Sequence, residues 1–256
     1  MNPLNATRYA MIAGVILFQG CSPRTPQAKI EVIDMTASIT PRAQRAALDM
    51  VQNQIGHMQR GDLLVLIPIT GDAQNDAGGH ILRITAPTVR EAYDTDLKRF
   101  NEEAGKQFDA WVASLEGYQS RTDILGALDA ARQELASLPK KTDRRLIVIS
   151  DFIEDDGRYN FVSAGSLPNA ESARELAGQL RVAHGFTLQG AHLCLGHLES
   201  TDFARLPTDR KDAIQAFWAA YFAEGNTPAE IRFDGTGILA DPDRGCVNGS
   251  PHASEN

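Results

Sequence analysis

The chain has 256 residues, of which 43% are hydrophobic and 23% charged, as is usual for a globular protein. This length allows one domain of about 200 residues with a full core, or two smaller domains. The formal net charge is −8 and no cluster of lysine and arginine stands out, which argues against a nucleic-acid partner.

The N-terminal residues differ in character from the rest of the chain. Arg8 precedes an apolar run over 9–18, which is too short to span a bilayer but has the length of a signal-peptide core. With Cys21 shortly after it, the run resembles a bacterial lipoprotein signal. The resemblance implies a signal peptide over 1–20, lipid attachment at Cys21, a tether over 21–28, and a lipid-anchored, periplasm-facing position on the outer membrane. An uncleaved membrane anchor and a buried helix are the alternatives.

Beyond this segment, short apolar runs alternate with amphipathic stretches. Apolar and β-branched runs predict strands over 29–34, 63–69, 81–84, 146–151, 186–195 and 230–233. Apolar residues at three- and four-residue spacing predict helices over 41–61, 93–115, 122–138, 170–182 and 208–221.

This alternation predicts one domain over 29–239, followed by a flexible tail over 240–256. We expect an α/β fold with three layers, doubly wound, in which helices cover both faces of a mostly parallel central sheet. The segment 81–84 is expected to pair back as one antiparallel edge strand.

Five oxygen-bearing side chains lie directly after predicted strands or at the start of a predicted helix. Asp34, Thr36 and Ser38 follow the first strand, Thr122 opens a helix, and Asp151 follows a buried strand. The carboxyl ends of parallel strands open on one edge of a sheet, so these loops can meet there. Two carboxylates, three hydroxyls and water suit a hard cation such as Mg²⁺, and the lack of histidine or thiolate argues against zinc. The sequence therefore predicts a metal site at these five residues.

The same three segments resemble the metal-ion-dependent adhesion site of von Willebrand factor A-type (VWA) domains. The resemblance rests on Asp34-Met35-Thr36-Ala37-Ser38, on the Thr122 loop and on Ile149-Ser150-Asp151. Phe152 stands where that family often has glycine. The resemblance implies a non-enzymatic binding module that holds Mg²⁺, or alternatively Mn²⁺ or Ca²⁺, and binds a carboxylate of a protein partner.

Two other functions stay open at this point. A magnesium-dependent phosphohydrolase of the haloacid-dehalogenase type would use Asp34 as nucleophile and Asp151 as metal ligand, but it expects a second aspartate where Thr36 stands. A metal-free scaffold would use Asp34 and Asp151 only to cap helices and turns.

Two further groups receive a plainer interpretation. The acidic run Glu154-Asp155-Asp156 is expected to be a charged loop, although it could extend a cation site. An export compartment would permit a disulfide between Cys194 and Cys246, but two unpaired thiols are slightly preferred because the two lie in such different surroundings.

Overall fold

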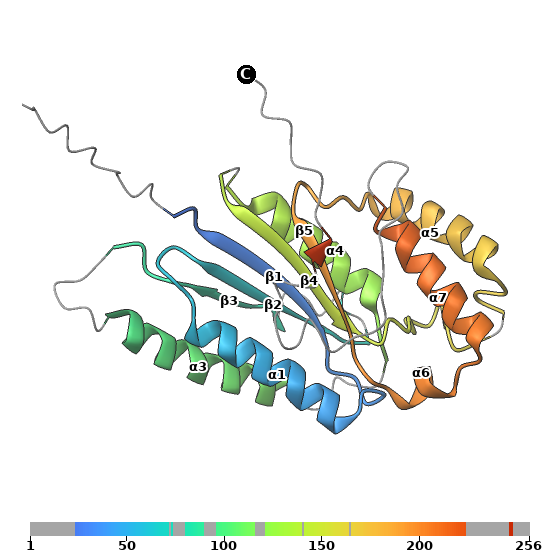
Figure 1. Ribbon diagram of the computed structural model, residues 1–256, viewed down its shortest axis with the longest axis horizontal. Coiled ribbons are helices and arrows are strands. Elements are labelled where there is room, and N and C mark those ends of the chain that lie inside the picture. The colour runs from blue at the N-terminus through green and yellow to red at the C-terminus, as the bar shows by residue number, and fades with distance from the viewer. Residues whose placement is uncertain are drawn as a thin grey trace, which may run out of the picture.

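The computed structural model describes residues 24–71, 73, 80–89, 96–115, 121–139, 141–163 and 165–223, and the backbone of 246–247 (Figure 1). The expected signal peptide, the lipidated Cys21 and the expected strand over 230–233 lie outside the described residues.

A central sheet of six strands has the order β3-β2-β1-β4-β5-β6. The strands are β1 (Gln27–Asp34), β2 (Leu63–Ile69), β3 (Leu82–Thr85), β4 (Asp143–Ser150), β5 (His192–His197) and β6 (Cys246–Val247). The strands β1, β2, β4 and β5 are parallel, whereas β3 runs antiparallel to β2 at one edge. The expected mostly parallel sheet with an antiparallel edge strand is confirmed. At the opposite edge, β6 pairs antiparallel with β5, inside the segment that was expected to be a tail.

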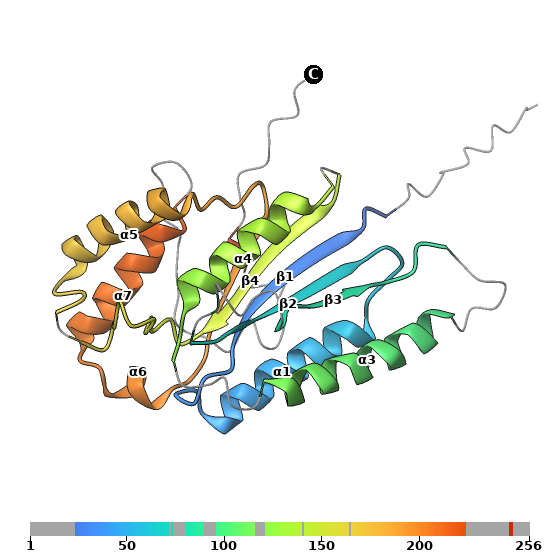
Figure 2. The ribbon, with the colours of Figure 1, turned by 180° about the vertical axis from the view of Figure 1, so that it is seen from behind.

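The helices form a layer on each face of the sheet (Figures 1 and 2). On one face lie α1 (Pro41–Gly56) and α3 (Asp96–Ser114), and on the other lie α4 (Ile124–Ser137), α5 (Ala170–His184) and α7 (Thr208–Tyr221). The short α6 (Thr201–Arg205) connects β5 to α7.

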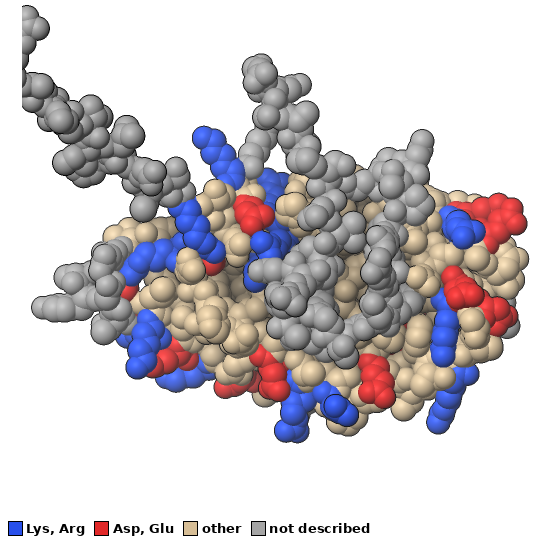
Figure 3. Space-filling model, in the orientation of Figure 1, with Lys and Arg blue, Asp and Glu red and all other residues tan. Residues whose placement is uncertain are grey.

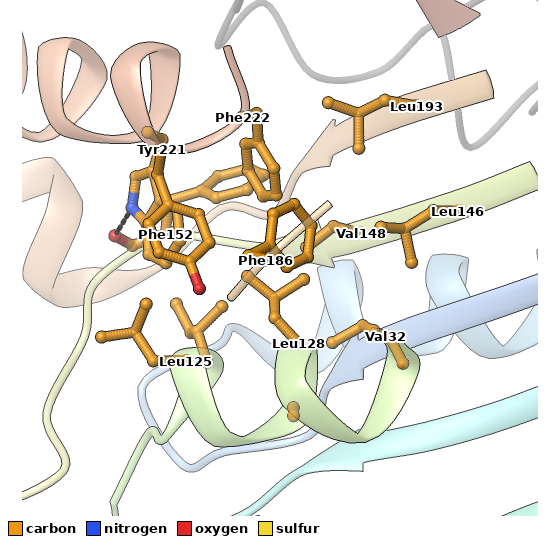
Figure 4. Packing of buried hydrophobic residues seen from close by; sticks show 14 of the residues in the cluster. Val32, Leu125, Leu128, Leu146, Val148, Phe152, Phe186, Leu193, Tyr221 and Phe222 are labelled. Carbon is orange, nitrogen blue, oxygen red and sulfur yellow. Dashed lines mark hydrogen bonds between the residues drawn. The ribbon is translucent and has the colours of Figure 1, made fainter. Parts of the chain in front are cut away.

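Neighbouring residues of the central strands contribute to different cores, because side chains alternate across a strand. Val32 packs into the core under α4, α5 and α7, whereas Ile33 packs into the core under α1 and α3. Figure 4 shows the first of these cores, where Phe152, Tyr221 and Phe222 lie close to the ends of the strands. Strands that are buried on both faces explain why their sequences are continuously apolar.

The strand register sets the position of the candidate site. Ile33 of β1 is paired with Ile149 of β4, and Asp34 of β1 is paired with Ile69 of β2. The three central strands therefore end at the same level, and the loops that follow them share one edge of the sheet.

Two expectations about the C-terminal half are wrong. The strand expected over 186–195 begins only at His192, because Gln189 and Gly190 both have positive φ (51° and 77°) and form a turn. Phe186 and Leu188 are apolar because they are buried in the core before this turn, without belonging to a strand. Cys194 is disulfide-bonded, whereas a free thiol was preferred, and the backbone of Cys246 in β6 lies directly opposite it.

Two properties of the surface complete the description. Basic and acidic side chains alternate over the part of the face that Figure 3 leaves uncovered, and neither sign gathers in one broad patch there. Within the described ranges, every helix is too short or too polar to cross a membrane.

Candidate metal centre

Asp34 ends β1 with both carboxylate oxygens engaged in a fully buried position. Its Oδ1 accepts hydrogen bonds from the Thr36 backbone N–H (3.0 Å) and the Thr36 hydroxyl (2.6 Å). Its Oδ2 accepts a hydrogen bond from the Ser150 hydroxyl (2.6 Å). Burial raises the pKa of Asp34, and these hydrogen bonds from Ser150 and Thr36 oppose that rise. The carboxylate is thus held in one orientation at the end of the strand.

The hydroxyl groups of Thr36 and Ser38 lie together beside this carboxylate. Their oxygens are 3.1 Å apart, and Thr36 is buried whereas Ser38 is partly exposed. A turn closed by the bond from the Ile39 N–H to the Thr36 carbonyl (3.2 Å) holds them there. The structure therefore brings Asp34, Thr36 and Ser38 to one point, with Ser38 nearest to solvent.

Asp151 follows β4, the strand next to β1, and is also buried. Its Oδ1 accepts a hydrogen bond from the Ile153 N–H (2.9 Å), whereas its buried Oδ2 has no hydrogen bond of good geometry among the described residues, although the Ser200 hydroxyl lies close to the carboxylate. Burial, and then the negative charge of Asp34, raises the pKa of Asp151 to about 7; the Ser200 hydroxyl and the Ile153 N–H act in the opposite direction. Two carboxylates that repel each other thus share one buried site.

The loop that carries Thr122 lies at the same edge of the sheet. The backbone of Thr122 pairs with that of Asp155 through two hydrogen bonds (3.1 and 2.8 Å), and Asp155 belongs to the loop after β4. The Asp123 N–H bonds to the carbonyl of Thr70 (2.9 Å), directly after β2. Thr122 is buried. The five predicted residues thus come from three loops at one sheet edge, Thr122 being placed there by its backbone.

Ser150 and Phe152 contribute to the centre in ways that the sequence did not reveal. The Ser150 hydroxyl bonds to Asp34 and also accepts a hydrogen bond from the Phe152 N–H (2.9 Å). Phe152 has a φ of 62°, a left-handed conformation that favours glycine, at the position where VWA domains often have it. Its ring packs edge-on against Trp218 (centroids 6.0 Å apart), and its carbonyl accepts a hydrogen bond from the Trp218 indole N–H (2.8 Å; Figure 4). This packing offsets the backbone strain, which is on the order of 1–3 kcal/mol.

A second group of acids lies next to this centre, where a charged loop was the preferred expectation and an extended cation site the alternative. The run does form a loop after β4, but Glu154 is fully buried there and its side chain contacts the first turn of α4. One carboxylate oxygen from each of Asp123, Glu154 and Asp156 lies within 4.8 Å of the others, close enough to hold a cation. The sequence signal was weak, because the acid-rich run 154–156 reads as solvent-exposed until the fold buries its first residue.

The first centre has the chemistry of a site for a hard divalent cation. Its donors are all oxygens, and the unpartnered Oδ2 of Asp151 is a buried acceptor that a cation would satisfy. A role of Asp34 as a nucleophile fits less well, because both of its oxygens accept short hydrogen bonds from Thr36 and Ser150.

The sequence matches no protein-family model and no curated protein. Among solved structures, the fold is similar to the manganese-loaded TRAP protein of Plasmodium vivax, with 11% identity, a TM-score of 0.42, and coverage of 87% of this chain and 75% of that one. It is also similar to a von Willebrand factor type A structure from Catenulispora acidiphila (14% identity, TM-score 0.37, 76% and 43% coverage). A third similar structure is the pilus adhesin SpaC of Lactobacillus rhamnosus GG, with 12% identity, a TM-score of 0.44, and coverage of 81% of this chain and 27% of that one. The chain spans less than half the length of the last two, and similarities at this level carry no information about ligand or partner.

Proposed function

We propose that this protein is a non-enzymatic, divalent-cation-dependent protein-binding module that is anchored to the bacterial cell envelope through a lipid on Cys21. One observation carries the proposal: Asp34 and Asp151 are buried together, and Oδ2 of Asp151 has no hydrogen bond of good geometry among the described residues. Burying two interacting carboxylates is costly unless a positive charge compensates them.

Asp34 and Asp151 would balance the charge of a cation, and Thr36, Ser38 and Thr122 would offer neutral oxygens. Mg²⁺ is the preferred ion for such a set, with Mn²⁺ and Ca²⁺ as alternatives. The ion held by these residues would offer a Lewis-acidic contact, to which a carboxylate of a protein partner would bind. The partial exposure of Ser38 marks the side from which a partner would approach.

Isothermal titration calorimetry with Mg²⁺ and Mn²⁺ tests the metal site. We expect Asp151→Asn to weaken binding at this centre at least about ten-fold, because it removes a charged ligand with almost no change in shape. Asp109→Asn makes the same charge change on the exposed face of α3 and is expected to bind as the unmodified protein does. Equal binding by all three proteins would contradict the proposal.

Two further measurements separate this function from its alternatives. Partner capture by the unmodified protein should be lost when a chelator is added and should also be lost in Asp151→Asn. Hydrolysis of p-nitrophenyl phosphate with Mg²⁺ that disappears in Asp34→Asn would instead establish a phosphohydrolase. Absence of Mg²⁺ and Mn²⁺ binding would leave a metal-free scaffold.

A further inference from the structure

Asp123, Glu154 and Asp156 form an acidic group that shares no residue with the centre proposed above. Asp123 is the N-cap residue of α4 and accepts a hydrogen bond from the Gly126 N–H (2.7 Å). Asp156 lies in the loop after β4, where its Oδ1 accepts hydrogen bonds from the N–H groups of Arg158 and Tyr159 (2.8 Å each). Backbone bonds thus hold both aspartates in place before any ligand is considered.

Glu154 makes this group more than a collection of surface acids. Its Oε2 accepts hydrogen bonds from the N–H groups of Ile124 and Leu125 (3.1 Å each), so it satisfies the first turn of α4. Its Oε1 is buried and has no hydrogen-bond partner among the described residues. A buried carboxylate oxygen without a partner is costly. Helix capping therefore accounts for one oxygen of Glu154 and leaves the other unexplained.

The negative charges around Glu154 favour the binding of a cation. Burial raises the pKa of Glu154 well above its usual value, and the nearby charges of Asp123 and Asp156 raise it further. Arg158 already pairs with Asp156 (2.7 Å), but its side chain is 62% exposed and has no hydrogen bond to Glu154. The Asp156 side chain is only 3% exposed, so the pair meets solvent on the Arg158 side alone, and a metal ion would replace one solvated guanidinium there.

We propose that Asp123, Glu154 and Asp156 form a second divalent-cation site, and that its preferred ion is Ca²⁺. The donors are all carboxylate oxygens, which suit hard cations. The three donor oxygens lie within 4.8 Å of one another, a spread that Ca²⁺ accommodates at Ca–O distances of about 2.3–2.6 Å. Ca²⁺ also accepts the irregular geometry of carboxylates from separate loops, whereas Mg²⁺ demands a near-ideal octahedron. A bound ion would tie the start of α4 to the loop after β4, the two segments that also pair at Thr122 and Asp155.

Calorimetric titration of the full chain with Ca²⁺, in the Asp151→Asn background, tests this site separately from the first. The chain offers conservative changes, since Glu154→Gln keeps an oxygen for the α4 N–H groups and Asp156→Asn keeps an acceptor for its turn. We expect either change to weaken Ca²⁺ binding at least about ten-fold. Asp155→Asn, between the two ligands in sequence but outside the acidic group, is the matched control and should bind as the background does.

Arg158→Gln provides a test with the opposite sign. Because it removes the cation that competes for Asp156, Ca²⁺ binding should tighten by about two- to five-fold, as expected for losing one ion pair whose cation is exposed to solvent. Circular dichroism checks that each variant is folded. If the Asp151→Asn variant does not fold, Asp34→Asn serves as the background instead.

The outcomes distinguish the two sites. Ca²⁺ binding in the background protein that is lost in Glu154→Gln or Asp156→Asn supports the second site, whether or not the first centre binds metal. The proposal is overturned if the background binds no Ca²⁺ at millimolar concentration, or if binding survives both changes.

Discussion

At the scale of single residues, Glu31 in the middle of β1 is a carboxyl group that folding removes from water. Its side chain is fully buried in the layer between the sheet and α1, and neither of its oxygens has a hydrogen bond of good geometry. Burial raises its pKa from 4.5 to about 7, and the charge of Lys29 and the nearby amide of Gln54 only partly oppose this. Alternation along β1 predicts a buried side chain at this position, yet glutamate occupies it.

We expect Glu31→Gln to stabilise the protein above pH 7 and to change little near pH 4.5. Between these values the folded protein keeps a proton that the unfolded chain has lost, so the free energy of unfolding falls as pH rises to about 7 and then stays lower. Glutamine has no such proton, and the gain at pH 8 should reach at most roughly 3 kcal/mol. Urea unfolding of the variant and of the unmodified protein at pH 4.5 and pH 8 measures this gain.

Glu102→Gln is the matched control, because Glu102 is exposed on α3. Its variant should follow the pH dependence of the unmodified protein. If Glu31→Gln follows that same dependence, ionisation of Glu31 does not weaken the fold.

At the scale of elements, Arg210 fixes α7 to the loop that follows the candidate site. Its guanidinium donates to the carbonyls of Phe161 (2.7 Å) and Ser163 (2.5 Å) and to that of Leu167. Arg210 is buried, and these bonds span about forty-five residues of chain. Within a helix pattern such an arginine reads as solvent-exposed, so the sequence did not indicate this role.

Arg210→Met should lower the free energy of unfolding by about 2–4 kcal/mol, because it leaves buried carbonyls without a donor while keeping a long apolar side chain. Thermal unfolding followed by circular dichroism measures the change. Arg205→Met, at an exposed position on α6, should stay within about 0.5 kcal/mol of the unmodified protein. Equal melting temperatures for both variants would rule out this role of Arg210.

At the scale of the whole molecule, the lipid anchor proposed for Cys21 and the disulfide of Cys194 constrain each other. Cys194 is disulfide-bonded, and Cys246 is its neighbour across the β5–β6 pairing. If Cys21 carries a lipid on its sulfur, it cannot take part in a disulfide, so the lipoprotein proposal requires Cys246 as the partner of Cys194. A disulfide also agrees with export to an oxidising compartment.

Mass spectrometry of protein isolated from envelope membranes, digested without reduction, checks both features. We expect an acylated N-terminal Cys21 and a linked pair of peptides that contain Cys194 and Cys246. A peptide joining Cys194 to Cys21 would refute the lipid anchor and this pairing together. Protein reduced before digestion is the control.

The sequence by itself determined the fold class and the order of the main elements. Continuous apolar runs such as 63–69 predict strands buried on both faces, and strand-end aspartates such as Asp34 and Asp151 point to one edge of a parallel sheet. These signals are local, so they can be read without knowing which strands are neighbours.

Only the tertiary structure decided which groups are buried and which remain without partners. Burial of Glu154, the unpartnered Oδ2 of Asp151 and the left-handed Phe152 depend on packing between segments far apart in the chain. A carboxylate in a polar loop and one under a helix have the same letter in the sequence, and they differ in their access to water. That difference turns an expected charged loop into a candidate cation site.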